Sequence, residues 1–308
     1  MEEFNKIWTE KYRPKTLKDM IISEETRELL ESYKDGIPHL LFAGRPGTGK
    51  TSLAQVLVNS MLECNFLYIN ASDESGIDTI RVKVSGFSRT KSFDGKIKTV
   101  ILDEADGLKP DGQKALRNLM ESNAANTRFI LTANYKHKII PALQSRCTDV
   151  DVKPELKEAV RRCAEILEAE GIKIPEDQKV NFVELIKHEF PDMRKCINQI
   201  QKYSVSGVLK ITRIGSDKEL LNKISSSLND GAVIKLRAYL IANEDRFSGD
   251  YDTLLADYLE HLYDAQIEDI TKKQCIATIA EHLYQSVFIV DKEINCFACL
   301  IALEGILS

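Results

Sequence analysis

Short apolar runs alternate with amphipathic stretches through the first half of the chain. Runs that are apolar and short predict buried strands at residues 39–44, 66–71, 98–106 and 127–134. Apolar residues at helical spacing predict helices at residues 50–62, 76–89 and 111–122. Strands separated by helices form a parallel sheet that is covered on both faces. The pattern therefore predicts an α/β fold whose ligands bind at the carboxyl ends of the strands.

Helical patterns replace the strands after about residue 151. A helix is expected from Pro154 to Gly171, because proline suits the first turn of a helix and glycine suits its end. Two more helical segments follow, residues 206–215 interrupt the pattern, and the remainder is again amphipathic. We expect three domains, an α/β domain, a small helical domain and an all-helical domain, over residues 1–150, 151–213 and 214–308.

Composition narrows the class of protein. The chain has 308 residues, of which 43% are hydrophobic and 29% charged, and this is typical of a soluble globular protein. Its apolar runs are too short or too interrupted to cross a bilayer, and its first residues are acidic, so we expect a cytoplasmic protein with no membrane partner. Seven scattered cysteines favour reduced thiols. Cys296 and Cys299 have metal-like spacing, but no second pair accompanies them, so core packing is expected.

The net charge of −5 argues against a protein that coats DNA with its whole surface. Contact with nucleic acid would have to be local. The best candidate is the basic stretch 81–98, "RVKVSGFSRTKSFDGKIK". Such charge runs are often only a solvated face, so both interpretations stay open.

The segment "GRPGTGKT", Gly44 to Thr51, matches G-x-x-x-x-G-K-[ST] between a predicted strand and a predicted helix. Its glycines let backbone N–H groups turn toward phosphate, and the helix N-terminus adds partial positive charge. Lys50 would neutralise the β- and γ-phosphates of ATP, and Thr51 would ligate Mg²⁺. A glycine-rich turn that merely begins a helix is the alternative. Strand, spacing and the Lys-Thr pair favour an ATP site, with further contacts from Gly47, Thr48, Gly49 and Ser52.

Carboxylates end the next strand of the pattern. In "TVILDEAD", Asp103 and Glu104 would emerge at the same sheet edge as the phosphate loop. Asp103 would support Mg²⁺, through water, and Glu104 would polarise the attacking water. Asn134, at the end of "FILTAN", would bind both the γ-phosphate and this water. Acidic residues often end strands in solvent and asparagine often forms turns, but their order after a phosphate loop favours catalysis.

These motifs, in this order and followed by helices, resemble the AAA+ ATPases, and within them the sliding-clamp loaders. "WTEKYRPKTLKDM" (8–20), "LQSRC" (143–147) and "FPDMRKCINQIQKYS" (190–204) look like clamp-loader segments. The short length, "SFDGK" and "KIIPALQSRC" look most like the large ATPase subunits of T4-like bacteriophage clamp loaders. The resemblance covers the first two domains well. The last ninety or so residues match only in length and helical character.

The resemblance implies roles for residues outside the phosphate loop. It places Thr9, Glu10, Lys11, Tyr12 and Ile21 around the adenosine, although an arm packed on the sheet would have the same geometry. It makes Arg194 the lid arginine that reaches the γ-phosphate, where a surface ion pair is the alternative.

Arg146 has no carboxylate beside it in "PALQSRCTDV". The resemblance implies that it acts in trans, as an arginine finger in the neighbouring subunit's site. A surface pair or cap is the alternative.

Three further assignments follow from the same resemblance. Gln113 would couple neighbouring ATPase domains, and Ile80 and Arg81 would lie where a helix tracks duplex phosphates. The C-terminal domain would form a collar.

The implied function is an ATP-driven clamp-loader subunit. It would assemble with copies of itself and one different subunit, open a ring-shaped clamp, grip primer-template DNA and release the clamp after hydrolysis. An AAA+ DNA translocase or helicase loader, and a scaffold that does not hydrolyse ATP, are the alternatives. The presence of Lys50, Thr51, Asp103 and Glu104 weighs against the scaffold.

Overall fold

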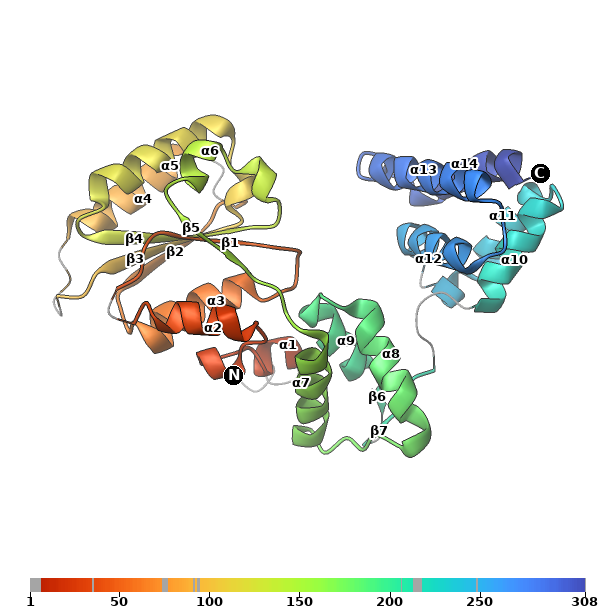
Figure 1. The fold of residues 1–308 in the computed structure, drawn as a ribbon, viewed down its shortest axis with the longest axis horizontal. Coiled ribbons are helices and arrows are strands. Elements are labelled where there is room, and N and C mark those ends of the chain that lie inside the picture. The colour runs from red at the N-terminus through yellow and green to blue at the C-terminus, as the bar shows by residue number, and fades with distance from the viewer. Residues whose placement is uncertain are drawn as a thin grey trace. The chain divides into compact units, whose positions relative to one another are not determined.

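The computed structural model describes residues 7–34, 36–73, 77–90, 92, 95–205, 207–212, 218–247 and 249–307, without the side chains of residues 77–80, 89 and 205. It divides into two compact units, residues 1–210 and 211–308. Figure 1 shows the sheet and a small group of helices in the first unit and a helical bundle in the second. Among the described residues, no helix combines the length and the apolar character needed to span a membrane.

The first unit is built on a five-stranded parallel sheet in the order β2-β3-β4-β1-β5. The strands are β1 Leu40–Ala43, β2 Phe66–Asn70, β3 Lys98–Asp103, β4 Thr127–Ala133 and β5 Thr148–Asp151. The α/β prediction is confirmed. Because β4 lies between β1 and β3, the loops that follow these three strands meet at one edge of the sheet.

Helices cover both faces of the sheet, as Figure 1 shows. They are α2 Glu24–Glu31, α3 Lys50–Val56, α4 Ile77–Arg89, α5 Pro110–Asn123 and α6 Pro141–Gln144. Successive side chains of a strand point to opposite faces, and β1 follows this rule: Leu40 and Phe42 pack in one core cluster with α2 and α3, and Leu41 packs in the other with α5. Burial of this strand from both sides explains its uninterrupted apolar sequence.

Two local features differ from the sequence prediction. The pattern gave no strand at residues 148–151, yet β5 pairs with β1 there. Its polar residues alternate with Val150, which is buried, and this is the pattern of an edge strand. The helix expected over 50–62 is α-helical to Val56 and then widens into a π-helical turn, Leu57–Met61.

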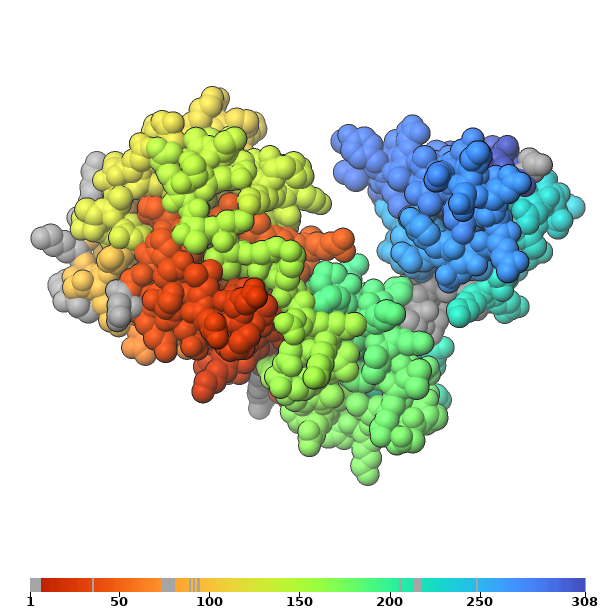
Figure 2. All heavy atoms as spheres, viewed as in Figure 1, coloured from red at the N-terminus to blue at the C-terminus, as the bar shows by residue number. Residues whose placement is uncertain are grey.

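A small helical part completes the first unit. It consists of α7 Leu156–Ala169, α8 Lys179–Glu189 and α9 Met193–Tyr203, with a hairpin of β6 Ser204–Val205 and β7 Val208–Leu209. The short N-terminal helix α1, Trp8–Lys11, contacts α9, and its Trp8 N–H donates to Gln201 Oε1 (3.1 Å). Figure 2 shows the N-terminal segment in red against the green atoms of these helices.

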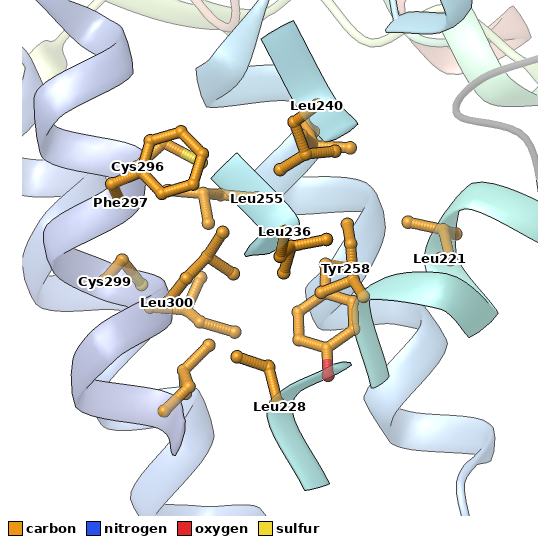
Figure 3. Packing of buried hydrophobic residues seen from close by; sticks show 14 of the residues in the cluster. Leu221, Leu228, Leu236, Leu240, Leu255, Tyr258, Cys296, Phe297, Cys299 and Leu300 are labelled. Carbon is orange, nitrogen blue, oxygen red and sulfur yellow. The ribbon is translucent and has the colours of Figure 1, made fainter. Parts of the chain in front are cut away.

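The second unit is entirely helical where it is described. Its helices are α10 Lys218–Asn229, α11 Val233–Ala242, α12 Tyr251–Asp264, α13 Asp269–Ser286 and α14 Lys292–Leu307. Leu236, Tyr258 and Leu300 meet in its core (Figure 3). Cys296 and Cys299 are buried in the same core, as the sequence predicts, and all seven cysteines are thiols outside any disulfide.

Candidate nucleotide site

The loop between β1 and α3 has the shape of a phosphate cradle. Gly47 and Gly49 have φ values of 74° and 94°, in the left-handed region that glycine enters easily. Lys50 starts α3, and its Nζ donates to the carbonyls of Gly44 (2.9 Å) and Arg45 (2.8 Å). Burial lowers the pKa of the Lys50 ammonium, despite the nearby carboxylates. The loop thus holds a buried cation among turned backbone groups, and phosphate fits this arrangement.

The acidic pair lies beside this loop. Asp103 ends β3 and is buried, and its carboxylate accepts a hydrogen bond from the Thr51 hydroxyl (2.8 Å to Oδ1). Glu104 follows in the left-handed region, at φ 55°, with its side chain exposed. Its backbone N–H donates to Thr132 Oγ1 (3.0 Å) on β4. The two carboxylates consequently face different surroundings, one held in the protein and one free to contact a ligand.

Asn134, which follows β4, lies in the same pocket. Its backbone N–H and that of Tyr135 both donate to Asp106 Oδ2, at 3.2 and 3.0 Å. The last acidic residue of "DEAD" therefore ties the end of β4 to the turn after β3. These hydrogen bonds hold the backbone of Asn134 beside the turn that carries Glu104.

The N-terminal arm forms another wall of the pocket. Thr9, Glu10, Tyr12 and Ile21 all line it. Lys11, which was expected with them, does not: its Nζ donates to Glu170 Oε1 (2.6 Å), just past the end of α7. The Tyr12 hydroxyl donates to the same oxygen (2.6 Å). Partial burial opposes ionisation of Glu170, but these two bonds lower the pKa of its carboxyl.

The helical part of the first unit closes over the phosphate loop. Arg194, in the first turn of α9, lines the same pocket. The N-cap of α9 is Asp192, whose Oδ1 accepts from the Lys195 N–H (3.0 Å), and the Met193 N–H donates to Gly47 O (3.1 Å). A Cβ on Gly47 would overlap the Asp192 carboxylate. The helix that carries Arg194 is therefore in direct contact with the loop.

The structure brings most of the predicted ATP-site residues into this one pocket. The predicted residues that line it are Thr9, Glu10, Tyr12, Ile21, Gly47, Thr48, Gly49, Lys50, Thr51, Ser52, Asp103, Glu104, Asn134 and Arg194.

Arg146 and Gln113 lie elsewhere in the chain. Arg146 follows α6, where its guanidinium donates to Ala142 O (2.8 Å) and pairs with Glu121 of α5. It thus has a carboxylate partner, distant in sequence. Gln113 is buried and bonds within its own chain: it donates to Leu108 O (3.1 Å) and Lys138 O (2.9 Å) and accepts from the Ile140 N–H (2.8 Å).

The DNA-binding prediction falls on α4. Ile80 and Arg81 lie near the start of this helix, whose first described residue is Ile77. Arg81 is exposed, and the side chain of Ile80 lies outside the described part of the chain. Of the basic stretch 81–98, Lys98 is buried and its Nζ donates to Phe87 O (2.9 Å), so it is not part of a solvated face.

Sequence reasoning missed several residues at the site. Arg162 of α7 lines the pocket, and nothing in "VRRC" distinguishes it from its neighbour Arg161. Tyr68 of β2 donates to Asp103 Oδ2 (2.7 Å), and Thr132 of β4 donates to Asp103 Oδ1 (2.5 Å). Both residues lie near the ends of strands that flank β3, and this position is the feature of the sequence from which they could have been predicted.

Comparisons with known proteins agree with this geometry. Residues 40–154 match the family of ATPases associated with various cellular activities (AAA), and residues 151–212 match the AAA+ ATPase lid domain of the sliding-clamp-loader large subunit. The replication factor C small subunit of Archaeoglobus fulgidus is 38% identical over 300 residues, covering 91% of each chain. That of Saccharolobus solfataricus is 43% identical over 252 residues, covering 76% of each.

The fold also resembles a solved structure. A mutant of Thermotoga maritima RuvB superposes with a TM-score of 0.53 at 18% identity, over 77% of this chain and 88% of that one. At this identity the likeness concerns the fold alone.

The sheet, the phosphate loop and the acidic pair define an AAA+ ATPase. The chain belongs to the clamp-loader ATPases, in the family of the replication factor C small subunits.

Proposed function

We propose that the pocket binds ATP with Mg²⁺ and that the chain hydrolyses ATP as one subunit of a sliding-clamp loader. The observation that carries this proposal is the 2.8 Å bond from the Thr51 hydroxyl to Asp103 at the phosphate loop. Because the Thr51 hydroxyl donates its hydrogen bond to Asp103, the lone pairs of its oxygen are left for a cation. A hydroxyl, a carboxylate and water are the ligands that Mg²⁺ prefers. Bound Mg²⁺ would supply positive charge to the β- and γ-phosphates.

The chain's own residues have separate tasks in this proposal. The arm residues Thr9, Glu10, Tyr12 and Ile21 enclose the adenosine. Lys50 moves from its loop carbonyls to the phosphates, and the amide of Asn134 and the carboxylate of Glu104 hold the attacking water, from which Glu104 takes a proton. Arg194 reaches the γ-phosphate from the lid, residues 151–213. Its helix touches the loop through Met193 and Gly47, which supports a link between nucleotide state and lid position.

Arg146 serves the site of the neighbouring subunit. In the single chain its guanidinium is held by Glu121, a surface partner that a more strongly charged phosphate can replace. Through its hydrogen bonds, Gln113 connects α5 to the loop after β3, which begins at Glu104, and to the loop after β4, which leads to Arg146. We infer that Gln113 transmits the state of one site to the arginine that enters the next.

The assembly contains copies of this chain and one different subunit. We propose an assembly of the T4-like bacteriophage kind, and the lid match to the sliding-clamp-loader large subunit supports a clamp-loader assembly. Residues 1–150, 151–213 and 214–308 act as ATPase, lid and collar. Arg81 and the start of α4 face duplex phosphates, and ATP binding forms the spiral that opens the clamp on primer-template DNA.

The test is steady-state ATP hydrolysis by the purified assembly, with and without primer-template DNA and clamp. DNA and clamp together should stimulate hydrolysis more than either alone. Arg146→Ala should abolish this stimulation while nucleotide binding persists. Arg117→Ala, which removes a second arginine near Glu121, is the matched control and should behave as wild type. Stimulation by DNA without clamp would favour a translocase, and a fully active Arg146→Ala assembly would remove this residue from the site.

A further inference from the structure

The carboxylate of Asp103 accepts hydrogen bonds from three hydroxyl groups, each on a different element. The Tyr68 phenol of β2 donates to Oδ2 at 2.7 Å, and Thr132 of β4 donates to Oδ1 at 2.5 Å. Thr51 of α3 lies between them, at 2.8 Å from Oδ1 and 3.1 Å from Oδ2. Each oxygen of the buried carboxylate therefore has a partner on a flanking strand, and the Thr51 hydroxyl faces both oxygens.

The sheet register explains how Tyr68 reaches this position. Asp103 pairs with Asn70 in the parallel ladder between β2 and β3. Tyr68 is two residues before Asn70, so its side chain leaves the sheet on the same face as that of Asp103. A diagonal neighbour is within reach of a long aromatic side chain. The hydrogen bond thus follows from strand order and side-chain length.

We propose that Tyr68 is a positioning residue for the magnesium site. Its phenol fixes the rotation of the Asp103 carboxylate, so that Asp103 continues to accept the hydrogen bond of the Thr51 hydroxyl. The lone pairs of the Thr51 oxygen then face the cation. The inference rests on the proposed function, because it assumes that Asp103 and Thr51 serve Mg²⁺. Tyr68 is not among the residues that line the pocket, so it acts through Asp103. Partners of this kind set the geometry and strength of metal ligands.

The surroundings of Tyr68 favour this role over simple packing. Its side chain is 39% exposed, whereas Asp103 is only 6% exposed, so the buried end of the contact is the carboxylate. Thr132 is a poorer probe, because it also accepts from the Glu104 N–H and its loss would disturb both acidic residues.

The experiment measures binding of a fluorescent ATP analogue to the full chain, first in EDTA and then during titration with Mg²⁺. Tyr68→Phe removes only the hydroxyl. Its affinity in EDTA should equal that of wild type, while the Mg²⁺ concentration that gives half of the metal-dependent gain should rise about tenfold. Tyr33→Phe removes a phenol that packs just after α2, outside the residues that line the pocket, and should leave both values unchanged. Urea unfolding of each variant confirms that the fold is intact.

Two results would overturn the inference. One is an unchanged Mg²⁺ half-point in Tyr68→Phe when wild type shows a clear Mg²⁺ effect. The other is an equal loss of affinity in EDTA and in Mg²⁺, which would make Tyr68 a residue for nucleotide binding or folding. If Mg²⁺ does not change nucleotide binding by wild type, the proposed function itself fails, so the two failures are distinguishable. Thr51→Val, which removes the ligand, sets the value expected for complete loss of the metal effect.

Discussion

Two separate constraints meet at Gly47. Its φ of 74° lies in the left-handed region, where a side chain costs about 1–2 kcal/mol. In addition, a Cβ would overlap the carboxylate of Asp192, the N-cap of α9. Displacing that carboxylate would release the Lys195 N–H at the start of the helix that carries Arg194. A single methyl group at the loop is therefore expected to disturb the lid.

We predict that Gly47→Ala lowers the free energy of unfolding by about 2–3 kcal/mol, the sum of backbone strain and a lost N-cap. Nucleotide affinity should fall between about tenfold and a hundredfold, because the phosphate cradle is displaced. Gly95→Ala is the matched control, since Gly95 has φ 71° and open space around it. It should lose only about 1–2 kcal/mol and bind nucleotide normally. Urea titration and nucleotide binding measure both effects, and equal nucleotide affinities in the two variants would refute the steric argument.

The sequence predicts the residues of the site that belong to local motifs, but it does not predict contacts between residues far apart in the chain. The phosphate loop, Asp103, Glu104 and Asn134 follow from motif and strand order, because parallel strands end at one edge. Glu170 and Glu121 could not be anticipated. They meet Lys11, Tyr12 and Arg146 only through the packing of helices that lie far apart in the sequence.

A histidine that can titrate, His39, stands just before strand β1 and contacts the neighbouring strand β4. The Nδ1 atom of His39 accepts the backbone N–H of Phe129 on β4 (3.1 Å). Burial, with the nearby Arg128 charge, lowers the pKa of His39 from 6.5 to about 4. The folded state thus favours the neutral imidazole. Its contribution to stability is complete above pH 6.5 and is lost as the pH falls toward 4.

We predict that His39→Asn makes the sheet less sensitive to acid. The asparagine Oδ1 can replace Nδ1 as acceptor without titrating. Between pH 7 and pH 4 wild type should lose about 2–3 kcal/mol more unfolding free energy than the variant. Denaturant unfolding at both pH values measures this difference. His137→Asn, at an exposed position, is the control and should show the wild-type pH dependence, and a similar dependence in His39→Asn would contradict the assignment.

Elements that are buried on both faces were the easiest to predict. Strand β3 is completely buried, and its apolar centre at residues 100–102 predicts it, although the strand ends at Asp103 and does not continue to residue 106. Strand β5 was missed because it has only four residues, and polar side chains alternate with its buried Val150. The π-helical turn after Val56 was equally invisible, because it depends on how the last turn of the helix packs and leaves the apolar pattern unchanged.

At the scale of the whole molecule, the two units have separate cores. The clusters of the first unit contain no residue beyond Val152 among those described, and the cluster of the second contains none before Leu220. A chain built in this way can fold its ATPase part around its own pocket. Arg146 is not among the arginines that line this pocket, because it pairs with Glu121 elsewhere on the unit.

Mixed assemblies test whether this arginine comes from the neighbouring subunit. Glu104→Gln removes the carboxylate that we propose polarises water, and Arg146→Ala removes the proposed finger, so each variant alone should be inactive. If the complete site combines Glu104 of one subunit with Arg146 of the next, random mixing should restore a fraction of sites equal to the product of the two variants' fractions. Recovery should therefore reach its maximum, about a quarter of the sites, at equal mixing and fall on either side. Steady-state ATP hydrolysis across a series of mixing ratios measures this recovery. If Arg146 acted within its own chain, no subunit of any mixture would possess both groups, and hydrolysis would stay at the level of the separate variants.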